Sequence, residues 1–261
     1  MTVSSQKVAL VTGAARGIGL AVAKRFLDEN WRVALLDIED KLLSESVERL
    51  AVPDRTLGLN CDVSDASAVA SAFDSLRQRF GRLDALINNA GIAVFAPLME
   101  TSNADWNRVL EVNLTGPFLC TKAAVPLMRE RGGAIVNITS ISAVRASALR
   151  SAYGTSKAGL AHLTKQLAVE LALLGIRVDG VAPGPVDTAM AKAVHTPEIR
   201  ADYHDAIPLD RYGLEEELAE AVFFLCSERA SYITGQILAV DGGFDAAGIG
   251  LPTLRGALRN R

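Results

Sequence analysis

Short apolar runs alternate along the chain with longer segments in which apolar residues recur every three or four positions. The apolar runs begin near Val8, Trp31, Thr56, Leu83, Ala134, Arg177 and Gln236. Continuous apolar runs are typical of parallel strands that are covered on both faces. Strands that alternate with helices predict an α/β fold in one unit, and we expect a single domain over residues 1–261.

The composition favours a globular protein and argues against several kinds of partner. The 261 residues are 49% hydrophobic and 22% charged, which indicates a globular chain with a substantial core. The net charge of -3 and the lack of a basic cluster argue against a nucleic-acid partner. No apolar run is long enough to span a bilayer, and the three widely separated cysteines form no metal or redox spacing. We therefore expect a cytoplasmic protein without a membrane partner or a metal.

A glycine-rich segment follows the first strand directly. It has the spacing Gly-x-x-x-Gly-x-Gly, with glycines at 13, 17 and 19, and Arg16 and Ile18 lie between them. Glycines between a strand and a helix let the backbone turn sharply and approach a diphosphate, whose charge is favoured at a helix N-terminus. We interpret Gly13, Arg16, Gly17, Ile18 and Gly19 as a dinucleotide-binding loop.

Asp37 ends the second strand, at the place where an acidic residue binds the ribose hydroxyls of such a cofactor. A carboxylate accepts a hydrogen bond from a free 2′-hydroxyl and repels a 2′-phosphate, so it favours NAD over NADP. Arg16 has the opposite effect, since a guanidinium can pair with that phosphate. We expect Asp37 to dominate and NAD to be preferred.

Tyr153 and Lys157 are four residues apart, so on a helix they share a face. A nearby ammonium favours phenolate and lowers the pKa of a tyrosine toward a value useful for proton transfer. By itself this pattern also fits an amphipathic helix with a half-buried tyrosine and a solvated lysine. Ser140, at the end of the fifth strand, and the glycine loop make an acid/base pair the better interpretation.

Together these motifs resemble the short-chain dehydrogenase/reductase family, from about Lys7 to Gly243. The resemblance implies a single-domain Rossmann fold, with a doubly wound sheet of seven parallel strands and helices on both faces. It also implies hydride transfer between a nicotinamide and a secondary alcohol or ketone. Tyr153 would be the acid/base, Lys157 would bind the nicotinamide ribose and lower the tyrosine pKa, and Ser140 would bind the substrate oxygen. Asn113, which interrupts a long helical pattern over residues 101–131, would hold a water and complete the tetrad.

The resemblance assigns further cofactor-binding positions. Asp62 and Val63 would contact the adenine, and Pro183, Gly184, Val186 and Thr188 would receive the nicotinamide carboxamide. The Asn88-Asn89-Ala90-Gly91 motif would border the cofactor; we take Asn88 as adjacent to it and Asn89 as mainly structural, and count Asn89, Ala90 and Gly91 as binding positions. Asp179 departs from the family pattern, which has Asn there, and this puts the local strand geometry in doubt.

Residues 189–212 lose clear periodicity and match the variable substrate lid of the family. Met190, Val194, His195, Tyr203 and His204 are candidate substrate contacts within it. Arg145 and Arg150 lie between Ser140 and Tyr153, and one of them could meet an anionic substrate group; solvated arginines are the simpler explanation. The tail, residues 244–261, could dock on a neighbouring subunit or remain loose.

A helix beyond Tyr153 is apolar on more than one side, and the family pairs it across subunits, so we expect a homo-oligomer, a tetramer or dimer. The preferred function is NAD-dependent oxidation of a polyol, sugar or hydroxyacyl compound. One alternative is an NADPH-dependent 3-oxoacyl carrier-protein reductase. Another, of a different class, is a non-catalytic nucleotide-binding sensor or scaffold on the same fold.

Overall fold

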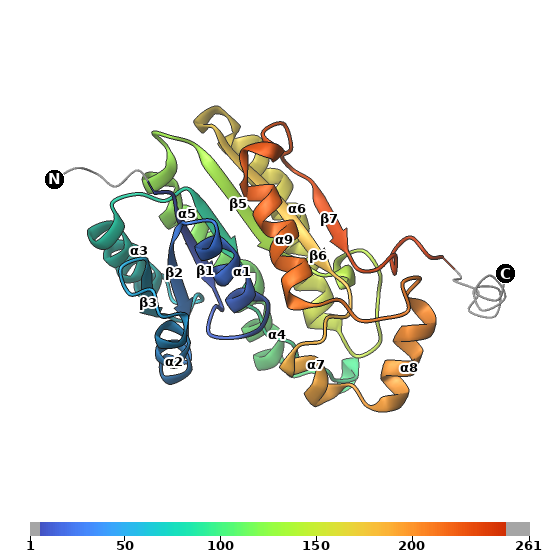
Figure 1. Ribbon diagram of the computed structural model, residues 1–261. Helices are drawn as coiled ribbons and strands as arrows, with labels where there is room; N and C mark the ends of the chain where they lie inside the picture. Colours follow the sequence, from blue (N-terminus) through green and yellow to red (C-terminus); the bar gives the residue numbers. More distant parts are fainter. Residues whose placement is uncertain (1–5, 249–261) are drawn as a thin grey trace.

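Seven parallel strands form one central sheet in the computed structural model of the protein, which describes residues 6–248 (Figure 1). The order β3-β2-β1-β4-β5-β6-β7 reverses direction between β1 and β4, which confirms the predicted doubly wound Rossmann-like sheet. The strands are β1 (Val8–Thr12), β2 (Arg32–Asp37), β3 (Thr56–Asn60), β4 (Ala85–Asn88), β5 (Gly133–Ile138), β6 (Ile176–Pro183) and β7 (Ile237–Val240).

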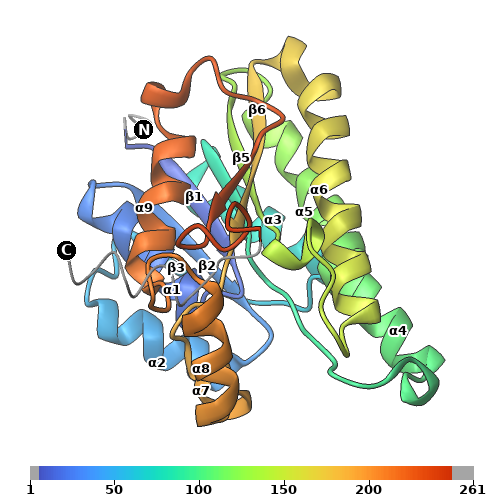
Figure 2. The ribbon, with the colours of Figure 1, turned by 90° about the vertical axis from the view of Figure 1, so that its right-hand side faces the viewer.

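Helices cover both faces of the sheet. In Figure 2, α1 and α9 lie on one side of the strands, and α5 and α6 lie on the other. The helices are α1 (Gly17–Asp28), α2 (Asp40–Leu50), α3 (Ala66–Phe80), α4 (Asn103–Leu110), α5 (Gly116–Met128), α6 (Ser151–Leu171), α7 (Ala189–Val194), α8 (Pro197–Ala206) and α9 (Glu215–Cys226).

Each face of the sheet has its own apolar core. In β1, Ala9 and Val11 pack with α1 and α9, whereas Val8 and Leu10 pack with α3 and α5 on the opposite side. All four side chains are fully buried. Because successive side chains of a strand point to opposite faces, one uninterrupted apolar run supplies both cores.

The long helical pattern over residues 101–131 is not one regular helix. A π-helical turn, Glu111–Thr115, joins α4 to α5, and Asn113 lies at its centre. The Asn113 side chain is completely buried and bonds to the backbone of Ile92, outside this helix. A wide turn of this kind frees backbone groups and turns a side chain out of the regular register.

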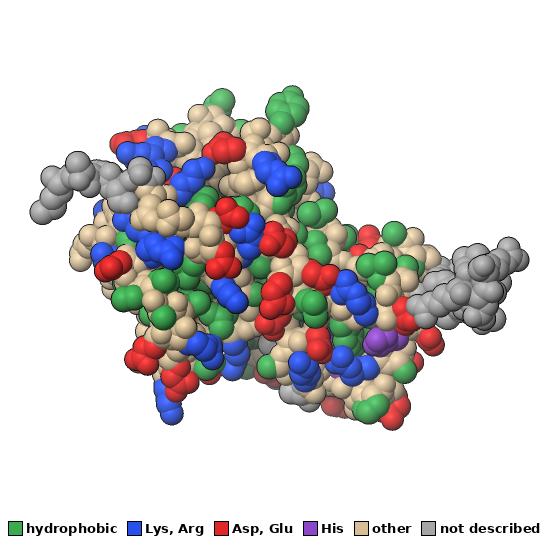
Figure 3. Space-filling view, viewed as in Figure 1, with side chains coloured by type: hydrophobic (Ala, Val, Ile, Leu, Met, Phe, Trp, Pro, Cys, Tyr) green, Lys and Arg blue, Asp and Glu red, His purple; other side chains and the backbone are tan. Residues whose placement is uncertain are grey.

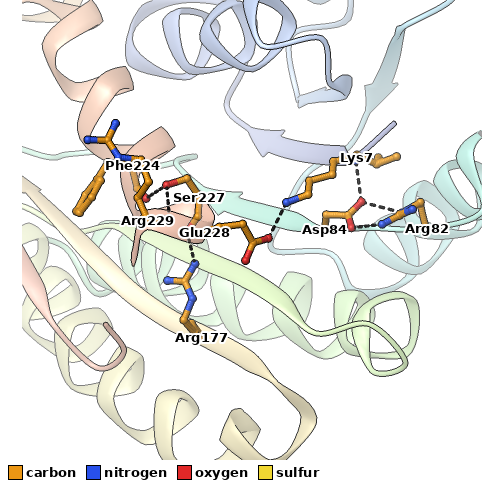
Figure 4. Close-up of polar contacts among 9 residues, drawn as sticks. Lys7, Arg82, Asp84, Arg177, Phe224, Ser227, Glu228 and Arg229 are labelled. Carbon is orange, nitrogen blue, oxygen red and sulfur yellow. Dashed lines mark hydrogen bonds and ion pairs between the residues drawn. The ribbon is translucent and has the colours of Figure 1, made fainter. Parts of the chain in front are cut away.

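Polar contacts tie the amino ends of the strands together, at the edge of the sheet opposite the carboxyl ends (Figure 4). The carboxylate of Asp84 accepts a hydrogen bond from the backbone amide of Val8, at 2.8 Å, and pairs with Arg82. Lys7 forms an ion pair of 2.8 Å with Glu228, which follows α9. These contacts link β1 to β4 and to the segment after α9, which stabilises the sheet away from its carboxyl ends.

Asp179, the residue that departs from the family pattern, is accommodated without distortion of its strand. Its carboxylate accepts a hydrogen bond of 3.0 Å from the backbone amide of Gln236 and lies 3.6 Å from Arg177. β6 keeps a continuous parallel register with both β5 and β7. The doubt that the sequence raised about local geometry is therefore not supported by the fold.

Residues 189–212 contain two short helices, α7 and α8, where the sequence lacked clear periodicity. Each begins at a capping threonine: Thr188 accepts a hydrogen bond from the amide of Ala191, and Thr196 from that of Ile199. The two capping threonines are the local feature of the sequence that indicates these helices. Of the predicted tail, only residues 244–248 fall among the described residues; the rest lies outside them.

The face of the molecule drawn in Figure 3 carries basic and acidic side chains that are interspersed, with apolar side chains between them. Within residues 6–248, none of the helices combines the length and apolarity needed to cross a bilayer.

Candidate active site

A cleft of about 430 Å³ lies at the carboxyl edge of the sheet, around the point where the strand order reverses. Its walls are the segments that follow β1 to β6, together with α6 and part of the 189–212 segment. In doubly wound sheets this crevice is the general place for ligands. Most of the predicted cofactor and catalytic residues meet here, although they come from distant parts of the chain.

The glycine loop forms one wall of the cleft and has the conformation that its glycines allow. Gly13 and Gly17 have φ values of +61° and +62°, in the left-handed region that favours glycine. α1 begins at Gly17, and no side chain caps its first turn. Free amides at a helix N-terminus attract an anion, so the loop fits a diphosphate. Arg16 and Ile18 complete this wall.

Gly19, a predicted cofactor-binding position, lies behind the cleft wall. A Cβ there would lie 2.2 Å from the carbonyl oxygen of Gly13, so only glycine permits the first turn of α1 to pack against the loop. Gly19 is buried and is not part of the cleft wall that the described residues form. Gly19 shapes the loop, and Gly13 and Gly17 line the cleft.

The part of the cleft where the sequence predicts ribose binding is acidic, because Asp37 and Glu39 line it. One carboxylate oxygen of Asp37 accepts a hydrogen bond of 2.9 Å from the amide of Ala15, and the other accepts one of 3.1 Å from that of Glu39. The Glu39 carboxylate forms an ion pair with Arg16. The arginine that could bind a 2′-phosphate is therefore already neutralised by a carboxylate next to Asp37.

Asp62 and Val63 line the cleft beyond β3, as the sequence predicted for an adenine site. Arg108 on α4 forms an ion pair of 2.7 Å with Asp62, and Ser64 donates hydrogen bonds to the other carboxylate oxygen. Burial acts to raise the pKa of Asp62, but these hydrogen bonds and the Arg108 charge hold it below its ordinary value. Arg108 was not recognised from the sequence, because it lies in a helix far along the chain.

Asn88 is the last residue of β4 and Asn89 follows it, and the structure gives the two side chains different places. Asn89 lines the cleft, and its amide donates to the carbonyl oxygens of Thr12 and Gly13, at 2.9 and 3.0 Å, which braces the glycine loop. Asn88 is 2% exposed and donates to Asn137 of β5, at 2.8 Å. We therefore correct the assignment of Asn88: it joins two strands in the core and does not border the cleft. Its register explains this, since neighbours along a strand face opposite sides.

The catalytic candidates converge on the middle of the cleft. Ser140, Tyr153 and Lys157 all contribute to its wall. Ser140 follows β5, and Tyr153 and Lys157 lie in the first two turns of α6. The Lys157 ammonium lies 5.8 Å from the centre of the Tyr153 ring and donates a hydrogen bond of 2.8 Å to the carbonyl of Ile138. The helical spacing thus brings both groups to one side of α6, as predicted.

The pKa of the Tyr153 phenol differs from expectation in this structure. Burial raises it above its ordinary value, and a hydrogen bond with Ser140 and the charge of Arg150 lower it only in part. Burial also lowers the pKa of Lys157 to about 8. We expected Lys157 to lower the pKa of the phenol; here desolvation dominates, because both groups are removed from water.

Asn113 lies behind the cleft wall, next to Gly91. Its Oδ1 accepts a hydrogen bond of 2.8 Å from the amide of Ile92, and its Nδ2 donates to Ser156 of α6, at 3.0 Å. A Cβ at Gly91 would lie 3.3 Å from both Asn113 Oδ1 and Lys157 Nζ, so a side chain there would crowd both. Gly91 and Ala90 themselves line the cleft.

The segment after β6 closes the cleft on the side of α7. Pro183, Gly184, Val186 and Thr188 all line it, as predicted. A Cβ at Gly184 would lie 2.7 Å from the Cα of Asp241, so glycine is required by this close approach. The Thr188 hydroxyl accepts a hydrogen bond from Ala191 as the cap of α7, and its own proton stays available to a ligand in the cleft.

A second cavity, of about 730 Å³, adjoins the cleft between the segment that precedes α6 and helix α8. Val194, His195 and Tyr203, three of the predicted substrate contacts, line both spaces. His204 does not line them and contacts the carbonyl of Asp210, at 3.0 Å. The Met190 side chain lies outside the described part of the chain.

The apolar walls of this second cavity contain residues that the sequence analysis did not single out as substrate contacts. They are Phe95, Leu149, Ile199, Ala206 and Phe244. Ile199 and Ala206 share one side of α8, seven residues apart, whereas Phe95, Leu149 and Phe244 lie in three separate segments that only the fold brings together. An apolar cavity beside the catalytic candidates is a typical substrate site.

A parallel doubly wound sheet with a diphosphate-shaped loop and a Ser, Tyr and Lys cluster on one edge defines a nucleotide-binding α/β enzyme. The family model described as enoyl-(acyl carrier protein) reductase matches residues 13–245. The chain belongs to the short-chain dehydrogenase/reductase family.

Three similar proteins illustrate the range of the family. The chain is 43% identical to cis-4-hydroxycyclohexanecarboxylate dehydrogenase of Sinomonas cyclohexanicum, over 93% of this chain and 98% of that protein. It is 39% identical to the 3-oxoacyl-[acyl-carrier-protein] reductase FabG of Thermotoga maritima, over 91% and 97%. The crystal structure of gox2181 superposes with a TM-score of 0.89, at 32% identity, over 93% and 97% of the two chains. These likenesses support an oxidoreductase that acts on an alcohol or a ketone.

Proposed function

We propose that the protein is an NAD-dependent dehydrogenase that interconverts a secondary alcohol and its ketone. One observation carries the proposal: Ser140, Tyr153 and Lys157 line the same cleft as the glycine loop and Asp37. The loop fits a dinucleotide, because Gly13 and Gly17 line the cleft with positive φ values and α1, whose first turn no side chain caps, begins there. When bound, the nicotinamide supplies the hydride acceptor for oxidation and the donor for reduction.

The protein residues then handle the proton. Tyr153 removes it from the alcohol, or returns it to the oxygen during reduction. Ser140 donates a hydrogen bond to the same oxygen, where negative charge develops. Lys157 would bind the nicotinamide ribose, and its charge, together with that of the oxidised ring of the bound cofactor, would offset the burial that raises the pKa of the phenol. Asn113 fixes the chain around Ile92 and holds the water through which the proton reaches solvent.

The choice of NAD rests on the ribose end of the cleft. Asp37 would accept a hydrogen bond from a free 2′-hydroxyl, and the guanidinium of Arg16 is paired with Glu39. A 2′-phosphate would meet two carboxylates at short range. Asp62, Val63, Asn89, Ala90 and Gly91 bind the adenosine and central part of the cofactor, and Pro183, Gly184, Val186 and Thr188 bind the carboxamide.

A second candidate is an NADPH-dependent 3-oxoacyl carrier-protein reductase. The likeness to FabG of Thermotoga maritima favours it. The acidic ribose end favours the first candidate. A non-catalytic scaffold has no need for a buried lysine beside a phenol, so we set it aside.

We also propose that the protein is a cytoplasmic homo-oligomer, a tetramer or a dimer. Val169 and Leu173, at the end of α6 and just beyond it, are 77% and 98% exposed, and Phe118 of α5 is half-exposed. Apolar side chains on these two helices are suited to burial against another subunit. Three buried free thiols fit a reducing compartment.

The decisive experiment is a screen of secondary alcohols with NAD+ at alkaline pH, where release of the product proton favours oxidation. The panel should contain polyols, sugars, hydroxyacyl compounds and cis-4-hydroxycyclohexanecarboxylate, with Tyr153→Phe as the blank. We expect Tyr153-dependent formation of NADH with at least one alcohol. Faster turnover of 3-oxoacyl substrates with NADPH than of any alcohol with NAD+ would favour the second candidate.

A further inference from the structure

Two arginines, Arg145 and Arg150, lie in the segment between Ser140 and Tyr153, and the structure gives them different surroundings. The Arg145 guanidinium donates to the carbonyl of Phe244 and lies 4.9 Å from the centre of its ring. It lines neither cavity in the described part of the chain. Arg145 therefore holds the segment after β7 in place.

Arg150 lines both the cofactor cleft and the adjoining cavity. It immediately precedes α6, one turn before Tyr153. Its charge lowers the pKa of both the Tyr153 phenol and the His195 imidazole, so the guanidinium lies near both rings. Arg150 therefore lies where the catalytic hydroxyls of Ser140 and Tyr153 meet the second cavity.

The contacts of Arg150 leave its charge uncompensated. One terminal nitrogen donates to the hydroxyl of Tyr203, at 3.1 Å, and the other lies 3.4 Å from that of Ser142. The guanidinium also stacks 5.0 Å from the centre of the Phe95 ring. Within residues 6–248 it forms no ion pair with a carboxylate, in contrast to Arg16, Arg108 and Arg200. A guanidinium has five donor hydrogens, so several remain for a ligand.

The rest of the second cavity is mainly apolar, with His195 as a further polar group and Asp202 as an exposed acidic one. A half-buried guanidinium without a counter-ion in such surroundings favours an anionic ligand, because carboxylates match its planar donors. The apolar walls suit the carbon skeleton of the same ligand.

We propose that the substrate is a hydroxy acid whose carboxylate binds Arg150 while its hydroxyl carbon lies at Ser140 and Tyr153. The proposal rests on the proposed function and adds the chemical class of the substrate. The acid binds with its carbon chain against Phe95, Leu149 and Phe244, and the guanidinium fixes which carbon faces Tyr153. A neutral alcohol of the same length would occupy the cavity without an ion pair to Arg150.

The test compares hydroxy acids with matched neutral alcohols in the full-length enzyme with NAD+. The pairs are 3-hydroxybutyrate with 2-butanol, 4-hydroxypentanoate with 2-pentanol, and 5-hydroxyhexanoate with 2-hexanol; in each pair a methyl group replaces the carboxylate. The variants are Arg150→Met, Arg150→Lys and the control Lys192→Met, which removes an exposed cation paired with Asp187 outside the cavity.

In the wild-type enzyme we expect the acid of at least one pair to have the higher kcat/KM. Arg150→Met should lower the acid-to-alcohol ratio of kcat/KM by about 10- to 100-fold, mainly through KM, since a charge-assisted pair is lost. Arg150→Lys should restore part of the ratio, and Lys192→Met should keep it within about 2-fold of the wild type, because that charge is distant and screened. An equal change for acids and alcohols in Arg150→Met would overturn the proposal.

Binding without turnover separates this proposal from the proposed function. Calorimetry of hexanoate, with hexanamide as the neutral control, should show binding of the acid to the wild-type enzyme with NAD+ and about 10-fold weaker binding to Arg150→Met. Equal affinity of hexanoate for the wild-type enzyme and Arg150→Met would contradict the anion site, even if alcohols are oxidised. Arg150-dependent binding without oxidation of any alcohol would retain the anion site and reject the dehydrogenase.

Discussion

The guanidinium of Arg16 is paired with the carboxylate of Glu39 in the wall of the cleft, beside Asp37. Arg16 belongs to the glycine loop, and Glu39 follows the strand that ends in Asp37. The same side chain that could select a phosphate is thus committed to an acid of this chain. We therefore expect the cofactor preference to depend on both partners.

Substitution of these acids should move the preference toward NADP. We expect Asp37→Ser to raise the NADP-to-NAD ratio of kcat/KM by about 10- to 100-fold, because it removes a carboxylate that repels the phosphate. Addition of Glu39→Gln should raise the ratio further, since it frees Arg16. Initial rates with both cofactors measure this. A ratio that does not change in the double variant would show that other residues select the cofactor.

Tyr153→Phe should lower kcat by about 10²- to 10⁴-fold, the usual contribution of a positioned acid/base. The variant keeps the ring and its packing, so NADH binding, measured by fluorescence titration, should change by less than about 3-fold. Loss of both activity and cofactor binding would instead indicate a structural role for the phenol.

Because of Lys157, the free energy of unfolding of the cofactor-free protein should change with pH in the alkaline range. Its pKa is about 8 in the folded protein, below its ordinary value of 10.5. The unfolded state therefore binds more protons between these values, and stability should rise with pH in that window. Because Lys157 is 3% exposed, we expect its contribution to increase by about 2 kcal/mol between pH 7.5 and 9.5.

Urea unfolding of the wild type and Lys157→Met at several pH values tests this. The difference in free energy of unfolding between the two proteins should shift in favour of the wild type as pH rises. A constant difference over the whole window would mean that the folded lysine keeps its ordinary pKa.

Substitution of Asp84 should lower the stability of the protein and leave its catalytic activity unaffected. Asp84→Ala leaves the Val8 amide and the Arg82 guanidinium without their partner, so we expect a loss of about 2–4 kcal/mol. Glu228→Gln is the matched control at the same edge of the sheet; its pair with Lys7 is exposed, and its loss should cost less than about 1 kcal/mol. Urea unfolding gives the free energies, and a similar small loss in both variants would contradict the prediction.

Apolar periodicity was sufficient to predict the sheet and the helices that cover it, because buried strands and amphipathic helices leave local patterns. Tyr153, Lys157 and the glycine loop were found because their chemistry depends on short spacings. The sequence did not reveal the roles of Glu39, Arg108 and Phe244, since each contacts the site from a segment that is distant in sequence. The pKa of Tyr153 also depends on burial, which a four-residue spacing does not specify.

The wide turn around Asn113 holds one residue more than a regular helical turn would. If all of these residues formed a regular α-helix instead, the extra residue would rotate α5 by about 100° about its axis relative to α4. The apolar side of α5 would then no longer face the sheet. An engineer who made this helix more regular would misplace an entire packing surface.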